Sequence, residues 1–432
     1  MSLKQPGYKT RLIDKKLSDC LKLFGAVSVE GPKWCGKTWT SLAHANNVTY
    51  IMDPAGNYSN KTRAQLNPSL ILEGRTPHVI DEWQEVPQIW DAVRFDIDKK
   101  PGFGKYILTG SVTPPRESYK HSGAGRIALI RMRPMTLYES GDSEGIISLA
   151  ELFTGKNIKP FAADIDLAHL IDITIRGGWP GTLNLPLEKA GIISAEYINA
   201  ILKNDLLNNG FSKRNSVKLN ILLRSLARNN TTSVNDTALS ADVDGAARKD
   251  QKNDDVTLTR NSVRGYCADL KRIFIIEDIP GWDPGIRSKT RIRMSSKMMF
   301  ADPSLAIAAL GIGRQHLLND LNTYGFMFEN LCLRDLYAYA EFHSGSLYHY
   351  RDNSSLEVDA IIEMKDGTWG AFEIKLGEHQ AEAAAQTLIR MRNKMKSNGA
   401  REPSCLAVIT GGGTGRKRND GVYVIPVNSL KP

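Results

Sequence analysis

Apolar and polar positions in the first 150 residues follow the pattern of strands and helices that succeed one another along the chain. Short apolar runs predict strands at 26–29, 48–52, 79–80, 106–108 and 127–130. Helix-forming residues at 37–45 follow the first of these runs. Because strands that alternate with helices usually pair in parallel, residues 1–150 predict an α/β domain built on a parallel sheet.

The middle region, 151–320, is patterned mainly as helices. Apolar residues at helical spacing predict a helix over 216–228, with the core positions Leu219, Leu222, Leu223 and Leu226. A second helix is predicted over 195–208. The polar stretch 241–255 has little to bury, so we expect it to be an exposed loop.

The end of the middle region resembles a winged helix. Thr259 is placed to cap a helix over 260–272, which leads into an apolar strand at 273–277 and a basic strand at 287–293. Arg260, Arg264 and the cations of the basic strand would then meet DNA phosphates. The same module could instead serve as a packing adaptor between the domains on either side.

The last region, 321–432, reads as helix, three strands, helix and strand. A helical segment at 325–331 precedes two strands joined by an Asp-Gly turn at 365–367, and an Ala-rich helix over 379–396 precedes the apolar strand 406–409. This order predicts a third domain, again of the α/β class. The Gly-rich basic stretch 411–418 lacks the spacing of a phosphate-binding motif, and we expect a flexible loop there.

Length, charge and cysteine content narrow the class of protein. A chain of 432 residues suggests two to four domains, and 41% hydrophobic with 24% charged residues is ordinary for a globular protein. No apolar run is long enough to cross a membrane, and the N-terminus lacks a signal-peptide core, so we expect a cytoplasmic protein. Five dispersed cysteines argue against zinc knuckles and disulfides. A net charge of +9 favours a polyanionic partner such as DNA.

One segment after the first strand carries the pattern G-x-x-x-x-G-K-[ST] of a phosphate-binding P-loop. Its residues are Gly31, Pro32, Lys33, Trp34, Cys35, Gly36, Lys37 and Thr38. Backbone N–H groups of such a loop bind the phosphates of ATP, the lysine neutralises the β/γ oxygens and the Thr38 hydroxyl ligates Mg²⁺. The alternative is an ordinary Gly-rich turn.

Four further residues complete a candidate ATPase site. Asp81 and Glu82 end an apolar strand, where Asp81 would hold Mg²⁺ and Glu82 would polarise the attacking water. Ser111, at the end of the strand that begins at Tyr106, is placed to reach the γ-phosphate. Arg126 follows a Gly-rich turn and suits an arginine finger, acting on the same or a neighbouring subunit of a homo-oligomer. Plainer interpretations are a capping acid and a structural arginine.

Taken in order, GPKWCGKT, IDEWQEVPQIW, YILTGS, GAGR and RMRPMTLYE resemble the AAA-type ATPases of prokaryotes that carry a nuclease-like domain at the C-terminus. The Gly-Gly-aromatic-Pro step at 177–180 resembles the start of the second half of that family. The resemblance extends over nearly the whole chain and implies an ATPase core, a middle winged-helix module and a C-terminal nuclease-like domain.

The C-terminal region holds a second constellation of charged residues. Alternation places Glu373 and Lys375 on one face of a strand, and the Asp-Gly turn allows Asp359 to lie beside them. This arrangement resembles the PD-(D/E)xK nucleases, which implies a restriction-endonuclease-like fold in which Asp359 and Glu373 chelate Mg²⁺ and Lys375 orients the attacking water. The helix acid of that superfamily corresponds to Glu329, and its helix glutamine to Gln386. The alternative is an ordinary exposed hairpin.

These features lead to one main hypothesis and two rivals. The main hypothesis is a Mg²⁺-dependent ATPase coupled to a domain that binds or cleaves DNA. The first rival is an ATP-driven switch whose C-terminal domain binds DNA or protein without cutting, because a fold does not fix an activity. The second, a small-molecule kinase, would leave 320–432 without a purpose.

Overall fold

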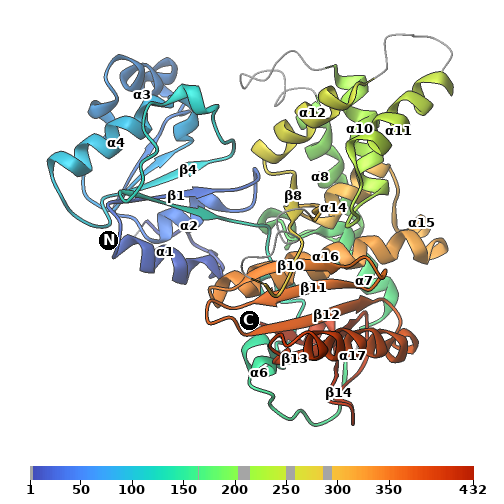
Figure 1. The fold of residues 1–432 in the computed structure, drawn as a ribbon. Coiled ribbons are helices and arrows are strands. Elements are labelled where there is room, and N and C mark those ends of the chain that lie inside the picture. Colours follow the sequence, from blue (N-terminus) through green and yellow to red (C-terminus); the bar gives the residue numbers. More distant parts are fainter. Residues whose placement is uncertain (1–2, 164, 203–214, 250–257, 286–293) are drawn as a thin grey trace. The chain divides into compact units, whose positions relative to one another are not determined.

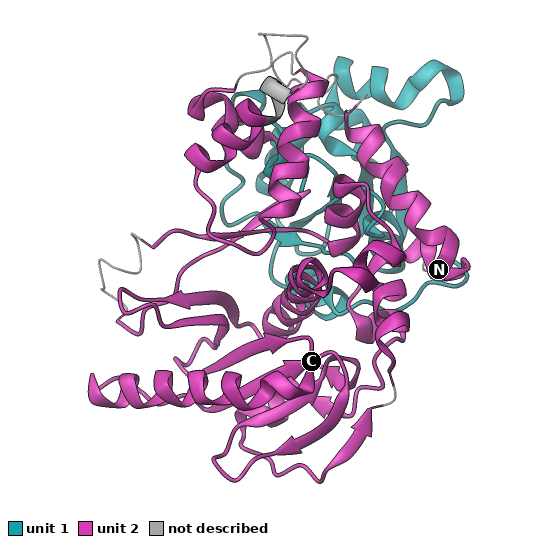
Figure 2. Ribbon diagram, turned by 90° about the vertical axis from the view of Figure 1, so that its right-hand side faces the viewer, with its two compact units in different colours: residues 1–134, 270–274 teal, residues 135–269, 275–432 magenta. Residues whose placement is uncertain are grey.

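The computed structural model describes residues 3–163, 165–202, 215–249, 258–285 and 294–432. The chain divides into two compact units, which are coloured separately in Figure 2. Unit 1 comprises residues 1–134 and 270–274, and unit 2 comprises residues 135–269 and 275–432.

Unit 1 is a five-stranded parallel sheet with helices around it, drawn in blue and cyan in Figure 1. The strand order is β2-β3-β4-β1-β5. The strands are β1 (Ala26–Glu30), β2 (Asn47–Tyr50), β3 (His78–Asp81), β4 (Tyr106–Gly110) and β5 (Ile127–Arg131). The helices are α1 (Ile13–Leu21), α2 (Lys37–Ala43), α3 (Ala55–Leu66) and α4 (Gln88–Lys99), with single 3-10 turns at Pro68–Ile71, Trp83–Glu85 and Arg116–Ser118.

The central strands of unit 1 are buried on both faces, as expected for a parallel sheet covered by helices. Val27, Val79 and Ile107 have no exposed surface. Trp83 and Trp90 pack with their ring centroids 5.0 Å apart within the core on one side of the sheet. The parallel sheet predicted from the apolar runs is therefore present.

Unit 2 contains a seven-stranded mixed sheet with the order β10-β11-β12-β13-β15-β14-β7. Its strands are β7 (Phe161–Ala163), β10 (Ser346–Arg351), β11 (Glu357–Glu363), β12 (Trp369–Lys375), β13 (Cys405–Thr410), β14 (Gly413–Lys417) and β15 (Tyr423–Pro426). The first three strands in this order pair antiparallel, and β12, β13 and β15 run parallel to one another. Helix α16 (Leu321–Phe342) precedes β10, and α17 (Ala381–Ser397) lies between β12 and β13 in the sequence, in the order predicted.

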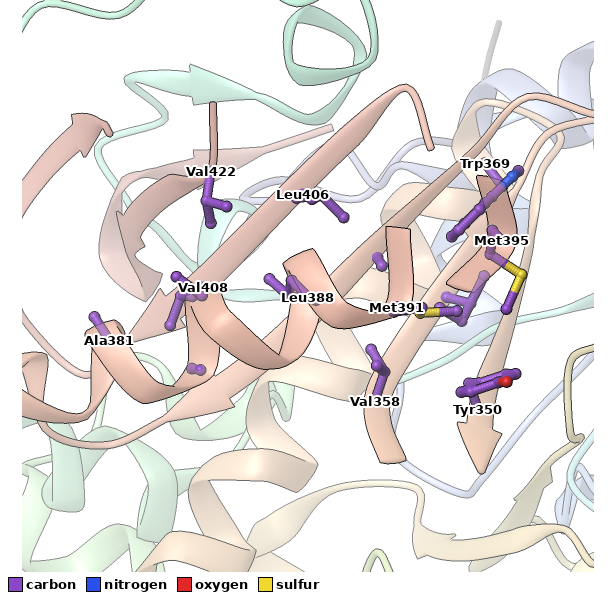
Figure 3. Packing of buried hydrophobic residues seen from close by; sticks show 14 of the residues in the cluster. Tyr350, Val358, Trp369, Ala381, Leu388, Met391, Met395, Leu406, Val408 and Val422 are labelled. Atoms are coloured by element: carbon purple, nitrogen blue, oxygen red, sulfur yellow. The ribbon is translucent and has the colours of Figure 1, made fainter. Parts of the chain in front are cut away.

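Helix α17 covers one face of this sheet and closes its core. Figure 3 shows Leu388 and Met391 of α17 directed toward Val408 and Val358 of the strands. All four side chains are fully buried, and each contributes about 1.5–3 kcal/mol relative to an exposed position. This packing fixes β11 and β12, the two strands that carry the C-terminal charged residues.

The remaining elements of unit 2 are short or helical. They are α5 (Leu137–Ser140), β6 (Ile147–Ser148), α6 (Leu149–Phe153), α7 (Leu167–Arg176), α8 (Leu187–Ala200), α10 (Ser216–Arg228), α11 (Asp236–Lys249), α12 (Arg260–Arg272), β8 (Ile276–Ile279), β9 (Lys297–Phe300), α14 (Pro303–Leu310), α15 (Arg314–Asn319) and β16 (Leu430–Lys431), with 3-10 turns at Pro180–Thr182, Glu378–Gln380 and Val427–Ser429. The last residues of α12, from Leu270, belong to unit 1. Strands β8 and β9 form an antiparallel hairpin, and β6 pairs with β16. Of the helices in the described residues, none is long and apolar enough to cross a membrane.

Two segments expected to be loops have regular structure. Residues 241–249 belong to α11, because Leu239 and Val243 give this polar segment a buried apolar side. Residues 413–417 form β14, which pairs with β15 and β7, so the flexible loop predicted over 411–418 is wrong. The expected helix over 195–208 corresponds to α8, which begins earlier, at Leu187, and ends at Ala200, while positions 203–208 of the predicted range lie outside the described residues.

The helix predicted over 260–272 is present as α12, with Thr259 Oγ1 accepting a hydrogen bond from Ser262 N at 3.2 Å. The strand after it begins at Ile276, later than predicted, because Phe274 has a left-handed backbone with φ of 64°. The basic segment 287–293 lies outside the described residues.

Candidate functional site

In unit 1, the loop between β1 and α2 forms a tight turn around the position expected for phosphates. Gly36 has a φ of 101°, which favours glycine, and α2 begins at Lys37. A Cβ atom on Gly31 would lie only 2.2 Å from the Met132 carbonyl oxygen. Both glycines of the motif are therefore required by the backbone itself.

Lys37 is buried inside this loop, with 5% of its surface exposed. Its Nζ donates to the Pro32 carbonyl oxygen at 2.8 Å, and in the described part of the chain no carboxylate is paired with it. The other loop side chains differ: Lys33 and Trp34 are exposed, whereas Cys35 is fully buried. The loop thus holds one cation whose contact is with a neutral oxygen.

Asp81 is the last residue of β3 and lies next to this loop. Its Oδ1 accepts hydrogen bonds from Thr38 Oγ1 at 2.8 Å and Thr109 Oγ1 at 2.6 Å. The structure therefore joins the predicted hydroxyl and carboxylate directly. Adjacent hydroxyl and carboxylate oxygens are hard ligands of the kind that Mg²⁺ prefers, so this pair fits that ion.

Glu82 follows in a left-handed conformation, with φ of 59° and ψ of 47°. Its backbone N donates to Thr109 Oγ1 at 3.1 Å, and its carboxylate accepts from Ser111 Oγ at 2.9 Å and from Gln84 Nε2. Ser111, placed by sequence near the γ-phosphate, thus contacts the candidate base. A strained backbone at such a position is typical of functional sites.

Arg126 lies at the amino ends of the strands, whereas the P-loop lies at their carboxyl ends. Because β1 and β5 run parallel and Ala26 pairs with Ile127, Arg126 precedes the amino end of β5, while the P-loop follows the carboxyl end of β1. The two ends of a five-residue strand are about 16 Å apart. The Arg126 guanidinium is about half exposed and donates to Asp98 Oδ1 at 2.9 Å. This placement contradicts a role for Arg126 at the P-loop of its own chain.

Arg11 is a loop-positioning residue that the sequence did not indicate. Only 5% exposed, it donates to the Cys35 carbonyl oxygen at 2.7 Å and to the Arg133 carbonyl oxygen at 2.9 Å. It therefore ties the P-loop to the segment after β5. An isolated arginine before a helix carries no local motif, so only the tertiary structure reveals it.

In unit 2, Asp359, Glu373 and Lys375 meet as predicted from their strand positions. Lys375 Nζ lies 3.0 Å from Asp359 Oδ2 and 2.7 Å from Glu373 Oε2. The same Asp359 oxygen accepts a hydrogen bond from Ile374 N at 2.8 Å. We call these three charged residues, together with Glu329, Glu357 and Lys297, the acid centre.

Lys297 enters the acid centre from β9 and was not indicated by the sequence. Its Nζ lies 3.3 Å from Glu329 Oε1 on α16, 3.1 Å from Glu357 Oε1 and 3.8 Å from Asp359 Oδ1. Only 4% of its side chain is exposed. Gln386, the other residue carried over from the nuclease resemblance, is exposed on α17 and contacts Glu382 instead.

Burial and mutual repulsion of the acids shift the pKa values in the centre. Burial, reinforced by Asp359, raises the pKa of Glu329 to about 7 and that of Glu373 to about 8. Burial alone would raise the pKa of Asp359, but the ammonium groups of Lys375 and Lys297 hold it below its usual value. Glu329 and Glu373 therefore take up protons at a higher pH than ordinary carboxyl groups do.

The donor set of the acid centre fits a hard divalent cation in chemical type, because it consists of carboxyl oxygens. Within the described ranges, however, no three His, Cys, Asp or Glu side chains are arranged as a metal-binding group. The two lysines occupy contacts that Glu329, Asp359 and Glu373 would otherwise offer.

A cavity of about 800 Å³ opens beside the acid centre within unit 2. Glu329 and Lys375 line it together with the exposed Phe326 and the glycine segment 411–413. A space of this volume is within the range of ligand pockets.

The Gly-Gly-Trp-Pro step is part of the core of unit 2. Trp179 is buried, and a Cβ atom on Gly178 would lie 2.1 Å from the Met135 carbonyl oxygen. Arg176, before this step, forms a buried ion pair with Asp142. Close packing accounts for the motif.

The cations expected to face DNA are partly paired. Arg264 donates to Asp236 Oδ2 at 3.0 Å from an exposed position, and Arg260 is exposed at the start of α12.

Three parts of the chain match family models. Residues 24–140 match a family described as an AAA domain, residues 167–316 match the domain of unknown function DUF8612, and residues 324–430 match the domain of unknown function DUF4143. Two mycobacterial proteins, the uncharacterized Mb2031c of Mycobacterium bovis and Rv2008c of Mycobacterium tuberculosis, are each 24% identical over 352 residues, which is 81% of this chain and 70% of theirs.

Solved structures resemble the chain only distantly. A Walker-type ATPase of Pyrococcus abyssi has a TM-score of 0.42 at 14% identity, over 71% of this chain and 97% of that one. RuvB, the Holliday junction branch migration motor of Thermotoga maritima, has a TM-score of 0.25 at 15% identity, over 62% and 89%. ORC1 of Aeropyrum pernix, solved with DNA, has a TM-score of 0.26 at 13% identity, over 71% and 93%. With the AAA-domain match and the P-loop geometry, residues 24–140 are a P-loop ATPase-type domain.

Proposed function

We propose that unit 1 hydrolyses ATP with Mg²⁺ and that this activity drives a DNA-handling function of unit 2. The hydrogen-bonded set of Thr38, Asp81 and Thr109 beside the buried Lys37 carries the first part of the proposal. A loop with an available ammonium group and an adjacent pair of hard oxygens suits a triphosphate and its metal.

Each residue of the site has a distinct task in this proposal. The loop N–H groups and Lys37 bind the phosphates, and Lys37 exchanges the Pro32 carbonyl for a phosphate oxygen. Thr38 and Asp81 would hold Mg²⁺, which supplies charge neutralisation when bound. Glu82 orients the attacking water, and Ser111 with Gln84 keeps its carboxylate in place until then.

Binding of a fluorescent ATP analogue to Lys37→Ala tests the nucleotide site. We expect its affinity to fall by at least about 10-fold, because a buried cation that faces phosphates is lost. Lys99→Ala is the matched control, since Lys99 is an exposed lysine at the end of α4. Parental affinity in a folded Lys37→Ala protein would refute the assignment.

A second candidate activity is phosphodiester cleavage at the acid centre of unit 2. The convergence of Asp359, Glu373 and Lys375, with Glu329 nearby, favours it. In this proposal Asp359, Glu373 and Glu329 would hold Mg²⁺, and Lys375 orients the water. The winged-helix module of the middle region, 151–320, would bind DNA phosphates, consistent with the net charge of +9.

Incubation of the protein with single-stranded, duplex and branched DNA tests this second activity. The reactions contain Mg²⁺ or Mn²⁺, with and without ATP, and binding is followed at rising salt. Cleavage that is lost in Asp359→Asn supports the nuclease. Salt-sensitive binding of DNA without cleavage would favour the non-cutting switch instead.

A further inference from the structure

Lys297 is held firmly in the acid centre by its own hairpin. In β9 it pairs with Ile279 of β8, and Ser295 two residues earlier accepts a contact from His349 Nε2 at 2.9 Å. Trp282, just after β8, donates its backbone N to the His349 carbonyl oxygen at 2.7 Å. The hairpin is thus anchored to β10 at two points, and these contacts hold Lys297 in place.

The oxygen atoms that Lys297 faces are the ones that Lys375 leaves available. Asp359 Oδ2 already receives Lys375 and a backbone N–H, whereas Oδ1 faces Lys297 at 3.8 Å. Lys297 also contacts Glu329 Oε1 at 3.3 Å. Two residues that would serve as ligands of a divalent cation therefore lie against this ammonium group.

We propose that Lys297 is the resident counter-ion of the acid centre and that it competes with divalent cations for Asp359 and Glu329. This inference rests on the proposed C-terminal site. A positive charge buried this close to a metal would repel it strongly, and a carboxylate oxygen directed at an ammonium group is not free to coordinate. Lys297 therefore keeps the carboxylates assembled without metal and sets the metal concentration that the centre requires.

Lys297 belongs to the segment that matches DUF8612, whereas Asp359, Glu373 and Lys375 belong to the segment that matches DUF4143. The metal requirement of the centre is therefore set by a residue from outside the C-terminal family match.

Thermal unfolding of the full chain in a Mn²⁺ titration tests the proposal. All proteins carry Asp81→Asn, so that the proposed metal site of unit 1 does not contribute. We expect Lys297→Met to lower the Mn²⁺ concentration at half-maximal stabilisation by at least about tenfold, because the competing charge is gone. Lys297→Arg, which keeps the charge, and Lys365→Met, which removes an exposed lysine, should remain near the parental midpoint.

A double variant keeps the test decisive if Lys297→Met alone does not fold. Lys297→Met with Glu357→Gln removes one charge of each sign, and it is compared with Glu357→Gln alone. A lower Mn²⁺ midpoint in the double variant supports the proposal. Equal midpoints with and without Lys297, or no stabilisation by Mn²⁺ in any variant, would overturn it.

DNA cleavage is measured separately on the parental chain. A parental protein that cleaves DNA while Lys297→Met leaves the Mn²⁺ midpoint unchanged retains the proposed nuclease and loses the role of Lys297. A lowered midpoint without cleavage by the parental protein retains the role of Lys297 and loses the nuclease.

Discussion

The two charged sites of this chain differ in what their charged side chains contact. In unit 1, the ammonium group of Lys37 contacts a neutral carbonyl, and Asp81 contacts hydroxyl groups. In unit 2, Lys297 and Lys375 are both in ion pairs with carboxylates. The first site has its charges available for a ligand, whereas the second has largely neutralised its own.

The nucleotide site therefore has charged groups ready to bind a ligand, whereas in the acid centre an ion pair must break before a carboxyl group can bind one. Buried ion pairs contribute little net stability, because desolvation offsets their attraction, but breaking one strongly destabilises a fold. When no ligand is bound, the two lysines keep the buried carboxyl groups of the acid centre paired. The P-loop site around Lys37 is instead stabilised by contacts with backbone and hydroxyl groups.

The largest expected effect is on ATP turnover and concerns Arg126 as a cation supplied to the nucleotide site by a neighbouring chain. If a homo-oligomer forms, Arg126→Ala should lower the turnover of ATP by about 10³-fold and affect nucleotide affinity much less, because an arginine finger acts on the transition state. Steady-state ATPase rates and binding of a fluorescent ATP analogue measure the two effects. Arg75→Ala, which removes another exposed arginine, is the control.

Mixing Arg126→Ala with Lys37→Ala distinguishes cis from trans action. A mixed oligomer pairs an intact P-loop with an intact Arg126 from the neighbouring chain, so we expect activity to return in part. No recovery in oligomers shown to be mixed would leave Arg126 as a surface residue paired with Asp98.

Glu82→Gln should separate binding from hydrolysis in unit 1. We expect turnover to fall by roughly 10²- to 10³-fold with nucleotide affinity retained, because a positioned base is lost while Lys37 remains. Glu73→Gln, at an exposed position, controls for the loss of a negative charge. Hydrolysis at the parental rate by folded Glu82→Gln would mean that another group activates the water.

Local patterns predicted the parts of these sites whose residues are close in sequence. Asp81 follows an apolar strand, and the Asp-Gly turn brings β11 and β12 together, so both arrangements were readable from a few consecutive residues. The same holds for the P-loop, where two glycines meet backbone constraints within one turn.

Long-range contacts account for what the sequence did not indicate. Lys297 precedes Glu329 by a helix-rich segment and carries no motif, so its position depends on how the β8–β9 hairpin docks. Arg11 reaches the P-loop only through the tertiary fold. The loop predicted at segment 413–417 is wrong because glycine content indicates a loop locally, whereas pairing with β15 and β7 makes the segment a strand.

Lys375→Met tests whether the ion pairs of the acid centre serve catalysis. We expect DNA cleavage to fall by about 10²-fold while DNA binding persists, because the lysine orients water and does not supply most phosphate contacts. Lys365→Met is the control. If the DNA affinity falls as much as cleavage, Lys375 is a binding residue.

The smallest expected effect on activity comes from a buried ion pair away from both sites. Asp142→Asn leaves Arg176 without its partner, and we expect unit 2 to lose about 3 kcal/mol of unfolding free energy at pH 7 with ATP hydrolysis little changed. Urea unfolding measured by a probe in unit 2 reports this loss. A variant as stable as the parental protein would mean that the ion pair between Arg176 and Asp142 adds no net stability.

The pH dependence of the stability lost in Asp142→Asn shows how a purely structural ion pair behaves, and the acid centre can be compared with it. Burial alone would raise the pKa of Asp142, but Arg176 holds it below its usual value. A carboxyl group with a lowered folded pKa stabilises the fold fully above the unfolded pKa, and this contribution disappears as the pH falls through the folded pKa. The difference between the parental protein and Asp142→Asn should therefore be full at pH 7 and shrink below about pH 4. If Lys375→Met shows this same profile, with stability lost and cleavage per folded molecule unchanged, then the acid centre is a structural ion-pair cluster and the contrast with the nucleotide site is one of stability alone.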